Sequence, residues 1–111
     1  MNRIIYTPYF KSRAKRLIKK YKSLRDDLTE LENDILNNPK IGESLGSNIY
    51  KIRLGVKSKG RGKSGSLRII TYLLEEKEHK TDIFYLTVYD KSEEDSIDKN
   101  EIKEILSHLG F

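Results

Sequence analysis

The spacing of apolar residues changes along this chain from a helical period to a strand period, and this change restricts the fold most. Between residues 10 and 35, apolar side chains recur every three or four positions, which predicts two amphipathic helices. Between residues 48 and 89, alternation and short apolar runs predict strands. Two helices with a very short connection form an antiparallel hairpin, so we expect this hairpin to cover a sheet.

Residues suited to helix capping mark where the predicted helices begin. Thr7 followed by Pro8 fits the start of the first helix, with the threonine as the cap. Ser23 begins the second helix and forms a variant capping box with Asp26, three residues further on. Asp98 is suited to cap a final helix near the end of the chain.

Four segments are predicted to be strands, namely 3–7, 48–54, 67–74 and 82–89. The element order is therefore β-α-α-β-β-β-α. We expect an α+β fold in which the helices pack on one face of a small, mostly antiparallel, twisted sheet. The length of 111 residues and the lack of a linker predict a single domain, 1–111.

The composition excludes several classes of protein and site. Hydrophobic residues make up 36% of the chain and charged residues 35%, and no apolar run is long enough to cross a membrane. There is no cysteine, so disulfides, thiolate zinc sites and cysteine nucleophiles are excluded. With only two histidines, a histidine-rich metal site is improbable. We expect a cytoplasmic protein that uses no metal and no cofactor.

Positive charge is concentrated in two blocks that contain no acid. Residues 1–25 carry nine basic side chains and residues 49–74 carry seven. Such blocks indicate a polyanion as the partner, although a solvated lysine face explains the first block equally well. On the first helix, we expect Lys15 and Lys19 to contact RNA.

The segment 55–66, GVKSKGRGKSGS, joins two predicted strands and combines four cations with four glycines. It is not a nucleotide-binding P-loop, because Lys57 stands where the first glycine is needed and a strand follows instead of a helix. Glycines allow close approach of a backbone, and cations bind phosphates. The residues expected to contact an RNA backbone are Lys57, Lys59, Arg61 and Lys63.

Four further cations lie on or beside the predicted strands. Lys51 and Arg53 share one face of their strand by alternation, Arg68 interrupts an apolar strand, and Lys91 follows the last strand. If the strands are adjacent, these cations converge on one sheet surface. The alternative is that Arg68 pairs with a carboxylate such as Asp90, while Lys51 and Arg53 are merely solvated.

Five motifs in this order resemble the RelE/HigB-type toxins of bacterial type II toxin–antitoxin systems. The chain is similar to that family over nearly its whole length, and most similar to the HigB-like branch of the RelE/ParE superfamily. The motifs are the segments 38–39, 50–54, 57–65, 67–72 and 88–91.

The resemblance implies a RelE-like fold and a ribosome-dependent endoribonuclease, or mRNA interferase, that inhibits translation. Such an enzyme cuts messenger RNA in the A site of the 70S ribosome without a metal. The RNA 2′-hydroxyl attacks the adjacent phosphate, which leaves a cyclic phosphate and a free 5′-hydroxyl. This reaction needs a base, cations to stabilise the phosphorane and an acid for the leaving oxygen. The family also implies a cognate antitoxin protein as a partner.

The resemblance also implies roles for individual residues. Lys51 and Arg53 match paired basic residues that hold the RNA, one of them assisting proton transfer. Arg68 matches an arginine that grips the scissile phosphate, as suits a side chain that never deprotonates. Lys91 matches a cation that stabilises the transition state or the leaving group.

One position departs from the family pattern. RelE itself has a tyrosine six residues after the last cation, where this chain has Ile97. The base is therefore left open among Tyr89, Tyr72, Asp90 and a Lys51 whose pKa is lowered by neighbouring cations. Tyr72 and Tyr89 have an alternative role, which is to stack on a base or to fill core space.

Two other functions remain as alternatives. One is a non-catalytic inhibitor of DNA gyrase, as in ParE-like relatives. The other is an RNA-binding module that does not cleave. The four cations Lys51, Arg53, Arg68 and Lys91 argue against the first, because a protein-binding inhibitor does not need them.

Overall fold

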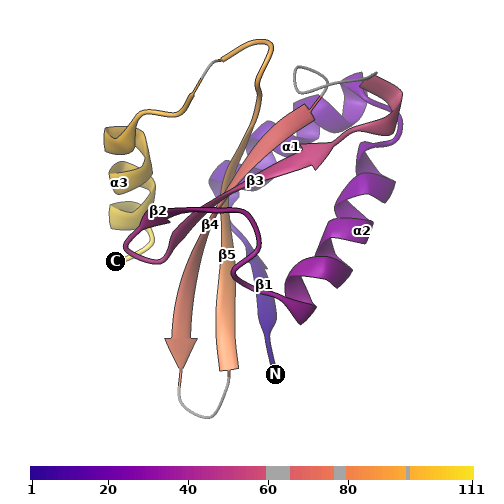
Figure 1. Ribbon diagram of the computed structural model, residues 1–111. Coiled ribbons are helices and arrows are strands. Elements are labelled where there is room, and N and C mark those ends of the chain that lie inside the picture. The colour runs from indigo at the N-terminus through magenta and orange to yellow at the C-terminus, as the bar shows by residue number, and fades with distance from the viewer. Residues whose placement is uncertain (60–65, 77–79, 95) are drawn as a thin grey trace.

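The structure, a computed structural model, describes residues 1–59, 66–76, 80–94 and 96–111. Its centre is a five-stranded twisted sheet with the strand order β1-β5-β4-β3-β2 (Figure 1). β1 runs parallel to β5, and the remaining neighbours are antiparallel. The predicted α+β class and the mostly antiparallel sheet are therefore confirmed.

The strands and helices follow one another in the predicted order, with one additional strand, β2. Their bounds are β1 Arg3–Tyr6, α1 Pro8–Lys20, α2 Leu24–Asn37, β2 Glu43–Gly46, β3 Ile49–Gly55, a 3-10 helix η1 Lys57–Lys59, β4 Ser66–Glu76, β5 Lys80–Asp90 and α3 Lys99–His108.

β2 is a short edge strand that the apolar pattern does not predict, because all four of its residues are exposed. Gly42 lets the chain enter this strand close to β3: its φ is +98°, and an added Cβ would lie 2.5 Å from the carbonyl oxygen of Lys51. Ser47 and Asn48 then turn the chain back with positive φ angles, and β3 follows.

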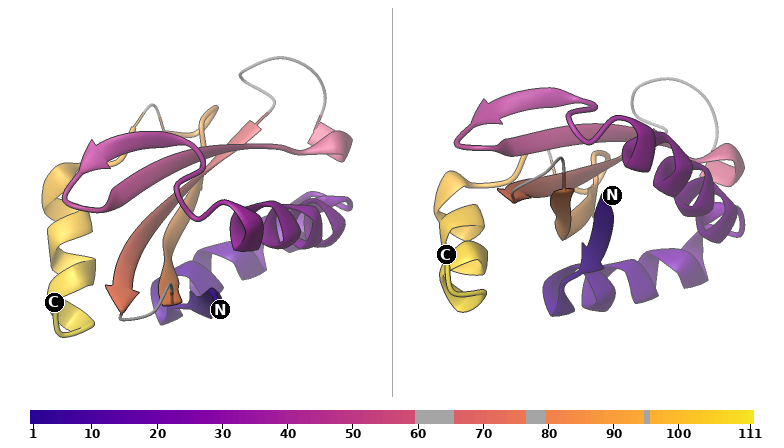
Figure 2. Two further views of the ribbon diagram at one scale, coloured as in Figure 1. Left: turned by 60° about the horizontal axis from the view of Figure 1, so that its bottom comes forward. Right: turned by 90° about the horizontal axis from the view of Figure 1, so that it is seen from below.

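Two separate apolar cores cover the two faces of the sheet. The helical hairpin α1–α2 packs on one face, where it buries Leu17 and Ile35 against strand residues such as Leu67. α3 packs on the opposite face, where Ile102 contacts a second cluster around Ile70. The prediction that all helices share one face is therefore wrong for α3, which covers the face opposite the hairpin (Figure 2). The reason is that β4 is apolar on both sides, so both faces of the sheet need a cover.

The predicted caps hold at two of the three helices. Thr7 accepts a hydrogen bond from the Phe10 amide, and Asp98 caps α3 in the same way. Ser23 makes no such bond, so the predicted capping box with Asp26 is wrong. Its backbone is already helical, and its hydroxyl instead donates to the buried carboxylate of Asp27 at 2.7 Å.

Candidate functional site

Three strands bring predicted site residues together in one row of the sheet. Arg53 of β3 pairs in register with Arg68 of β4, and Arg68 pairs in turn with Tyr89 of β5. Paired residues point to the same face, and so does Lys51, two positions from Arg53 on β3. We call Lys51, Arg53 and Arg68 the cationic face. It lies on the α3 side of the sheet.

The hairpin core fixes which way these cations point. On β3, Ile52 and Leu54 are buried under the helical hairpin, and on β4 the same is true of Leu67 and Ile69. The alternating residues must then point to the other face of the sheet. A slip of one residue would bury the cations and expose the core, so the apolar pattern holds the cationic face in place.

Arg68 and Arg53 have no acidic partner among the residues that the structure describes. Arg68 is half-buried and donates a hydrogen bond to the hydroxyl of Ser66. No ion pair joins Arg53 or Arg68 to a carboxylate in the part of the chain that the structure describes. Like charges in facing positions destabilise a sheet, so this pair is suited to hold an anion.

The alternative pairing of Arg68 with Asp90 does not occur. Asp90 pairs in register with Leu67 and points to the hairpin face, where it is 1% exposed. Its carboxylate accepts hydrogen bonds from the Tyr21 hydroxyl at 2.5 Å and from the amide and hydroxyl of Ser92 at 2.9 and 2.7 Å. Asp90 is therefore on the wrong side of the sheet to act as the base.

Lys51 has an acidic partner at the edge of the sheet. Its Nζ lies 3.4 Å from Oε2 of Glu43, the residue that pairs with it on β2. The side chain is partly exposed and also lines the cavity described next. Within the cationic face, Lys51 therefore combines a carboxylate partner, Glu43, with a position on the cavity wall.

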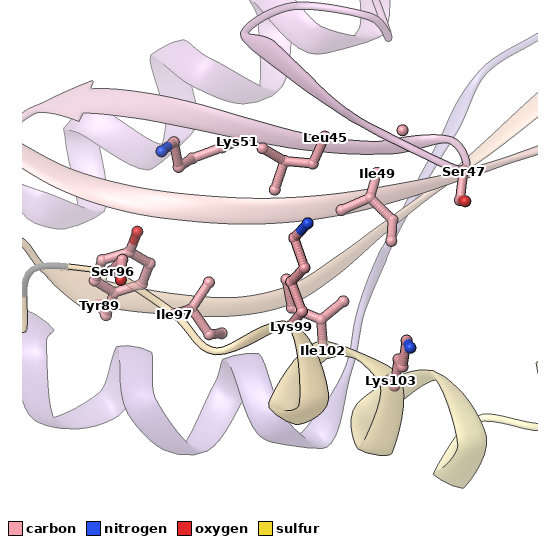
Figure 3. Close-up of a pocket in the computed structure, with 11 residues that line it drawn as sticks. Leu45, Ser47, Ile49, Lys51, Tyr89, Ser96, Ile97, Lys99, Ile102 and Lys103 are labelled. Atoms are coloured by element: carbon pink, nitrogen blue, oxygen red, sulfur yellow. The ribbon is translucent and has the colours of Figure 1, made fainter.

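A cavity of about 480 Å³ opens between the β2–β3 turn and α3, beside the cationic face. Lys51 and Tyr89 face it from two strands, and Ile97 forms part of its wall (Figure 3). Lys99 and Lys103, one turn apart on α3, also line it. Sequence reasoning missed these two lysines because eleven acids dominate the charge of residues 75–111; their spacing of four was the signal.

Tyr89 is 2% exposed and remains a neutral phenol at ordinary pH. Burial raises the pKa of Tyr89, while the positive charge of Arg68 acts in the opposite direction. A phenol with a raised pKa is a poor base but keeps its proton for donation. Tyr89 is therefore better suited to donate a hydrogen bond than to accept the 2′ proton.

Lys91 follows β5 directly and is half-buried. The loop after it is tied to α1 by ion pairs. Glu93 contacts Arg16 at 3.0 Å and Lys20 at 3.7 Å, and Glu94 contacts Arg13 at 2.9 Å. These pairs hold the backbone of Lys91 at the end of β5, one residue beyond the Asp90–Leu67 pair.

Of the cations predicted to contact RNA, those with described side chains lie outside the cationic face. Lys57 is exposed and paired with Glu30 at 3.1 Å, and this hydrogen bond raises the pKa of Lys57. The side chain of Lys59, with Arg61 and Lys63, lies outside the described residues. Lys15 and Lys19 are exposed on α1, on the other side of the sheet from Arg68. Their contact with RNA stays a prediction.

Tyr72 lies on the α3 side of the sheet but belongs to an aromatic cluster. Its ring centroid is 4.9 Å from that of Phe111 and 6.3 Å from that of Phe84. It stands four positions along β4 from Arg68. These contacts favour the core-filling role that the sequence left open.

Two classes of site are not found in the parts of the chain that are described. No group of three or more histidine, aspartate or glutamate side chains is placed to hold a metal ion. No described helix has the length and apolar character needed to cross a membrane.

Comparison with known proteins identifies the family and agrees with the fold. Residues 2–109 match the family model of the RelE toxin of the RelE / RelB toxin–antitoxin system. The fold is similar to that of an arginine-to-alanine double mutant of E. coli toxin RelE in the free state, with a TM-score of 0.56 and 19% identity. That match covers 84% of this chain and 86% of the other. The chain belongs to the RelE toxin family, which implies an antitoxin partner.

Proposed function

We propose that this toxin is a ribosome-dependent endoribonuclease that cleaves messenger RNA in the ribosomal A site and so inhibits translation. The RNA 2′-hydroxyl attacks the neighbouring phosphate, and the products are a cyclic phosphate and a free 5′-hydroxyl. The reaction needs no metal and no cofactor. The ribosome and messenger RNA are then its partners, and the cytoplasm is where it works.

The observation that carries this proposal is the facing pair Arg53 and Arg68. Their side chains share one face of the sheet, and neither has a carboxylate partner within the described residues. A guanidinium binds two phosphate oxygens at once and keeps its charge throughout the reaction. Two of them around one phosphate stabilise the charge that gathers on the phosphorane.

The roles within the pair follow from exposure. Arg68 is half-buried in the central strand and hydrogen-bonded to Ser66, so its guanidinium is held in place. We assign to it the grip on the scissile phosphate. Arg53 is exposed nearer the edge of the sheet and binds the RNA strand as it enters.

Proton transfer is assigned to the residues that face the cavity. Of the four candidate bases, Asp90 points to the other face, Tyr72 is packed among aromatic rings, and Tyr89 keeps its proton. This leaves Lys51, which we assign as the base: its uncharged amine takes the proton of the 2′-hydroxyl and becomes an ammonium group, which pairs with Glu43 beside it. The Tyr89 hydroxyl donates a hydrogen bond to the reacting phosphate, and Lys91 stabilises the leaving oxygen.

Loop 57–63 is proposed to bind the RNA backbone through Lys57, Lys59, Arg61 and Lys63. The same loop supports a place in the HigB-like branch of the family, whose members share this basic glycine-containing segment. Binding of this kind weakens steeply as salt concentration rises.

Primer extension on a translated message tests the proposal. Wild-type protein is expected to produce cuts that require ribosomes, and Lys51→Met and Arg68→Ala are expected to lose them while remaining folded. Arg3→Ala is the matched control, because it removes an arginine from the far edge of the same sheet.

Cuts on naked RNA would overturn ribosome dependence. Cuts that survive Arg68→Ala would overturn the phosphate grip. An absence of cuts, together with inhibition of DNA gyrase, would favour the ParE-like alternative.

A further inference from the structure

Two lysines on α3 line the cavity without an acidic partner. Lys99 and Lys103 stand four residues apart, so they lie on the same side of the helix. Both are exposed, and neither forms an ion pair with an acid in the described parts of the chain. The acid between them, Glu101, contacts Arg13 of α1 at 3.3 Å. We call Lys99 and Lys103 the α3 lysine pair.

The stability of α3 does not explain this spacing. Positive charges four residues apart repel each other and destabilise a helix. An acid three or four positions away would relieve the repulsion, but α3 has none at those positions from either lysine. The α3 lysine pair is therefore suited to hold an anion from outside the chain, as are Arg53 and Arg68.

The cavity beside the α3 lysine pair combines positive charge with apolar walls. Lys51 is its third cation, and no acid is among its lining residues in the described chain. Ile49, Ile97 and Ile102 contribute apolar lining. The volume of about 480 Å³ lies in the range of about 300–1,000 Å³ that is common for pockets holding small organic groups. A nucleotide presents both a planar base for the apolar walls and a phosphate for the lysines.

The cavity adjoins the cationic face. Tyr89 lines the cavity and pairs in register with Arg68. Lys51 and Tyr89 lie toward one end of the cavity, and Lys99 and Lys103 lie further along it (Figure 3). An RNA strand that is held at Arg68 and runs past Tyr89 therefore reaches the α3 lysine pair.

We propose that the cavity binds the nucleotide next to the scissile phosphate, with its base against the apolar walls and its outer phosphate at the α3 lysine pair. This inference rests on the proposed function, because it takes Arg68 to hold the scissile phosphate. It makes α3 a second RNA-contacting element beside the sheet. A carboxylate of a protein segment would also suit the lysines, but a nucleic-acid strand supplies regularly spaced anions to the arginines and the lysines together.

Binding of an RNA that cannot be cleaved tests the proposal without relying on catalysis. The probe is a fluorescent single strand of about six nucleotides with 2′-O-methyl groups, which lack the attacking hydroxyl. Its partner probe has the same phosphates but abasic sugars. Fluorescence anisotropy gives the affinity of the purified chain for each probe at salt between about 50 and 200 mM. We expect the base-bearing strand to bind at least about fivefold more tightly than the abasic strand.

Two double variants that remove the same charge locate the phosphate contact. Lys99→Gln/Lys103→Gln is expected to weaken binding of the base-bearing strand by about fivefold or more. It is also expected to reduce the slope of log affinity against log salt by about 0.7 to 1.4, the value for one or two lost phosphate contacts. Lys11→Gln/Lys22→Gln, at two exposed lysines of the helical hairpin, is expected to change the affinity by less than about twofold. Lys99→Arg/Lys103→Arg keeps the charge and is expected to retain binding, and thermal melts check that every variant is folded.

Ile97→Gln tests where the base lies. If the base packs against Ile97, this variant binds the base-bearing strand about threefold or more weakly and binds the abasic strand as wild type does. The gap between the two probes therefore narrows. Strands of A, C or U are expected to bind wild type within about threefold of one another, because aliphatic walls and flexible lysines do not read base edges.

The ribosome separates two sources of the same phosphates, messenger RNA and ribosomal RNA. For Lys99→Gln/Lys103→Gln, we expect the toxin concentration at half-maximal cleavage of ribosome-bound message to rise by about fivefold or more. The maximal single-turnover rate is expected to fall by less than about threefold. Cosedimentation with ribosomes that carry no message is expected to equal that of wild type. A loss of this cosedimentation would assign the lysines to ribosomal RNA and so overturn the proposal.

Four other results would overturn it as well. They are equal losses in the two glutamine double variants, an unchanged gap between the probes in Ile97→Gln, no binding of either probe by wild type at low salt, and tighter binding of a polyglutamate peptide than of the RNA. The last result would assign the cavity to a protein segment. The proposed function fails separately, if wild-type protein makes no ribosome-dependent cuts. Wild-type cleavage and binding by Lys99→Gln/Lys103→Gln would leave the nuclease in place and remove only the α3 contact.

Discussion

Arg53 and Arg68 stand directly opposite each other on β3 and β4, although like charges in facing positions weaken a sheet by up to about 1 kcal/mol. We therefore expect Arg53→Gln to raise the free energy of unfolding by roughly 0.5 kcal/mol. Urea denaturation measures this change. Arg3→Gln is the control, because Arg3 bonds to Asp82 at 2.9 Å and its loss removes an attraction. A loss of stability in Arg53→Gln, like the loss expected in Arg3→Gln, would contradict the view that the pair is strained without RNA.

Tyr89→Phe tests the role of the buried hydroxyl. Because burial raises the pKa of Tyr89, its phenol stays protonated across the working pH range and acts as a donor. We expect a loss of about tenfold or more in the single-turnover cleavage rate, with an unchanged shape of the pH profile between about pH 6 and 9. If Tyr89 were the base, the wild-type rate would rise toward alkaline pH and the variant would lose that rise.

Tyr21→Phe tests how the end of β5 is held. The Tyr21 hydroxyl donates to Asp90 at 2.5 Å, and both residues are buried. Removing the donor leaves a buried carboxylate with one partner fewer, so we expect a loss of about 1–3 kcal/mol in the free energy of unfolding. Tyr9→Phe, at an exposed tyrosine of α1, the helix that ends just before Tyr21, is expected to change it by less than about 0.5 kcal/mol. Similar values for the two variants would mean that the Tyr21–Asp90 bond does not stabilise the fold.

Arg16→Gln tests how the stability contributed by the loop after β5 depends on pH. The hydrogen bond from Arg16 lowers the pKa of Glu93 below its ordinary value. A lowered folded-state pKa adds stability above the ordinary carboxyl pKa, and this stability is lost as the pH falls through the folded value. We expect Arg16→Gln to melt below wild type near pH 7, with the difference closing in acid.

Lys22→Gln is the control for that comparison, since Lys22 is exposed and makes no ion pair within the described ranges. Its melting temperature is expected to follow wild type at every pH. High salt is expected to reduce the effect of Arg16→Gln, because the pair is exposed and is screened. A difference that persists unchanged in acid would mean that Arg16 stabilises the loop through something other than the charge of Glu93.

Much of the fold could be predicted because local patterns agree with the tertiary structure. The helical stripes through Leu17 and Ile35 predicted the hairpin that is found, and alternation on β3 predicted which residues face away from it. β2 could not be predicted, because an exposed edge strand of four residues carries no apolar pattern. The position of α3 had a signal in β4, which is apolar on both faces and so needs a cover on each.

The sequence predicts candidate site residues one at a time but does not predict their geometry. Alternation placed Lys51 and Arg53 on one face, but the facing of Arg53 and Arg68 depends on strand register, which is set by turns and long-range packing. For the same reason the sequence could not show that Asp90 belongs to the hairpin core, bonded to Tyr21, 69 positions earlier in the chain.

The most direct test of the central claim is a double-mutant cycle on Arg53 and Arg68. Single-turnover cleavage of ribosome-bound message is measured for wild type, Arg53→Ala, Arg68→Ala and the double variant. If both arginines hold one phosphate, each single variant loses activity and the double variant loses far less than the product of the two losses. Losses that simply multiply, or wild-type cleavage in either single variant, would show that the two arginines do not act on the same phosphate.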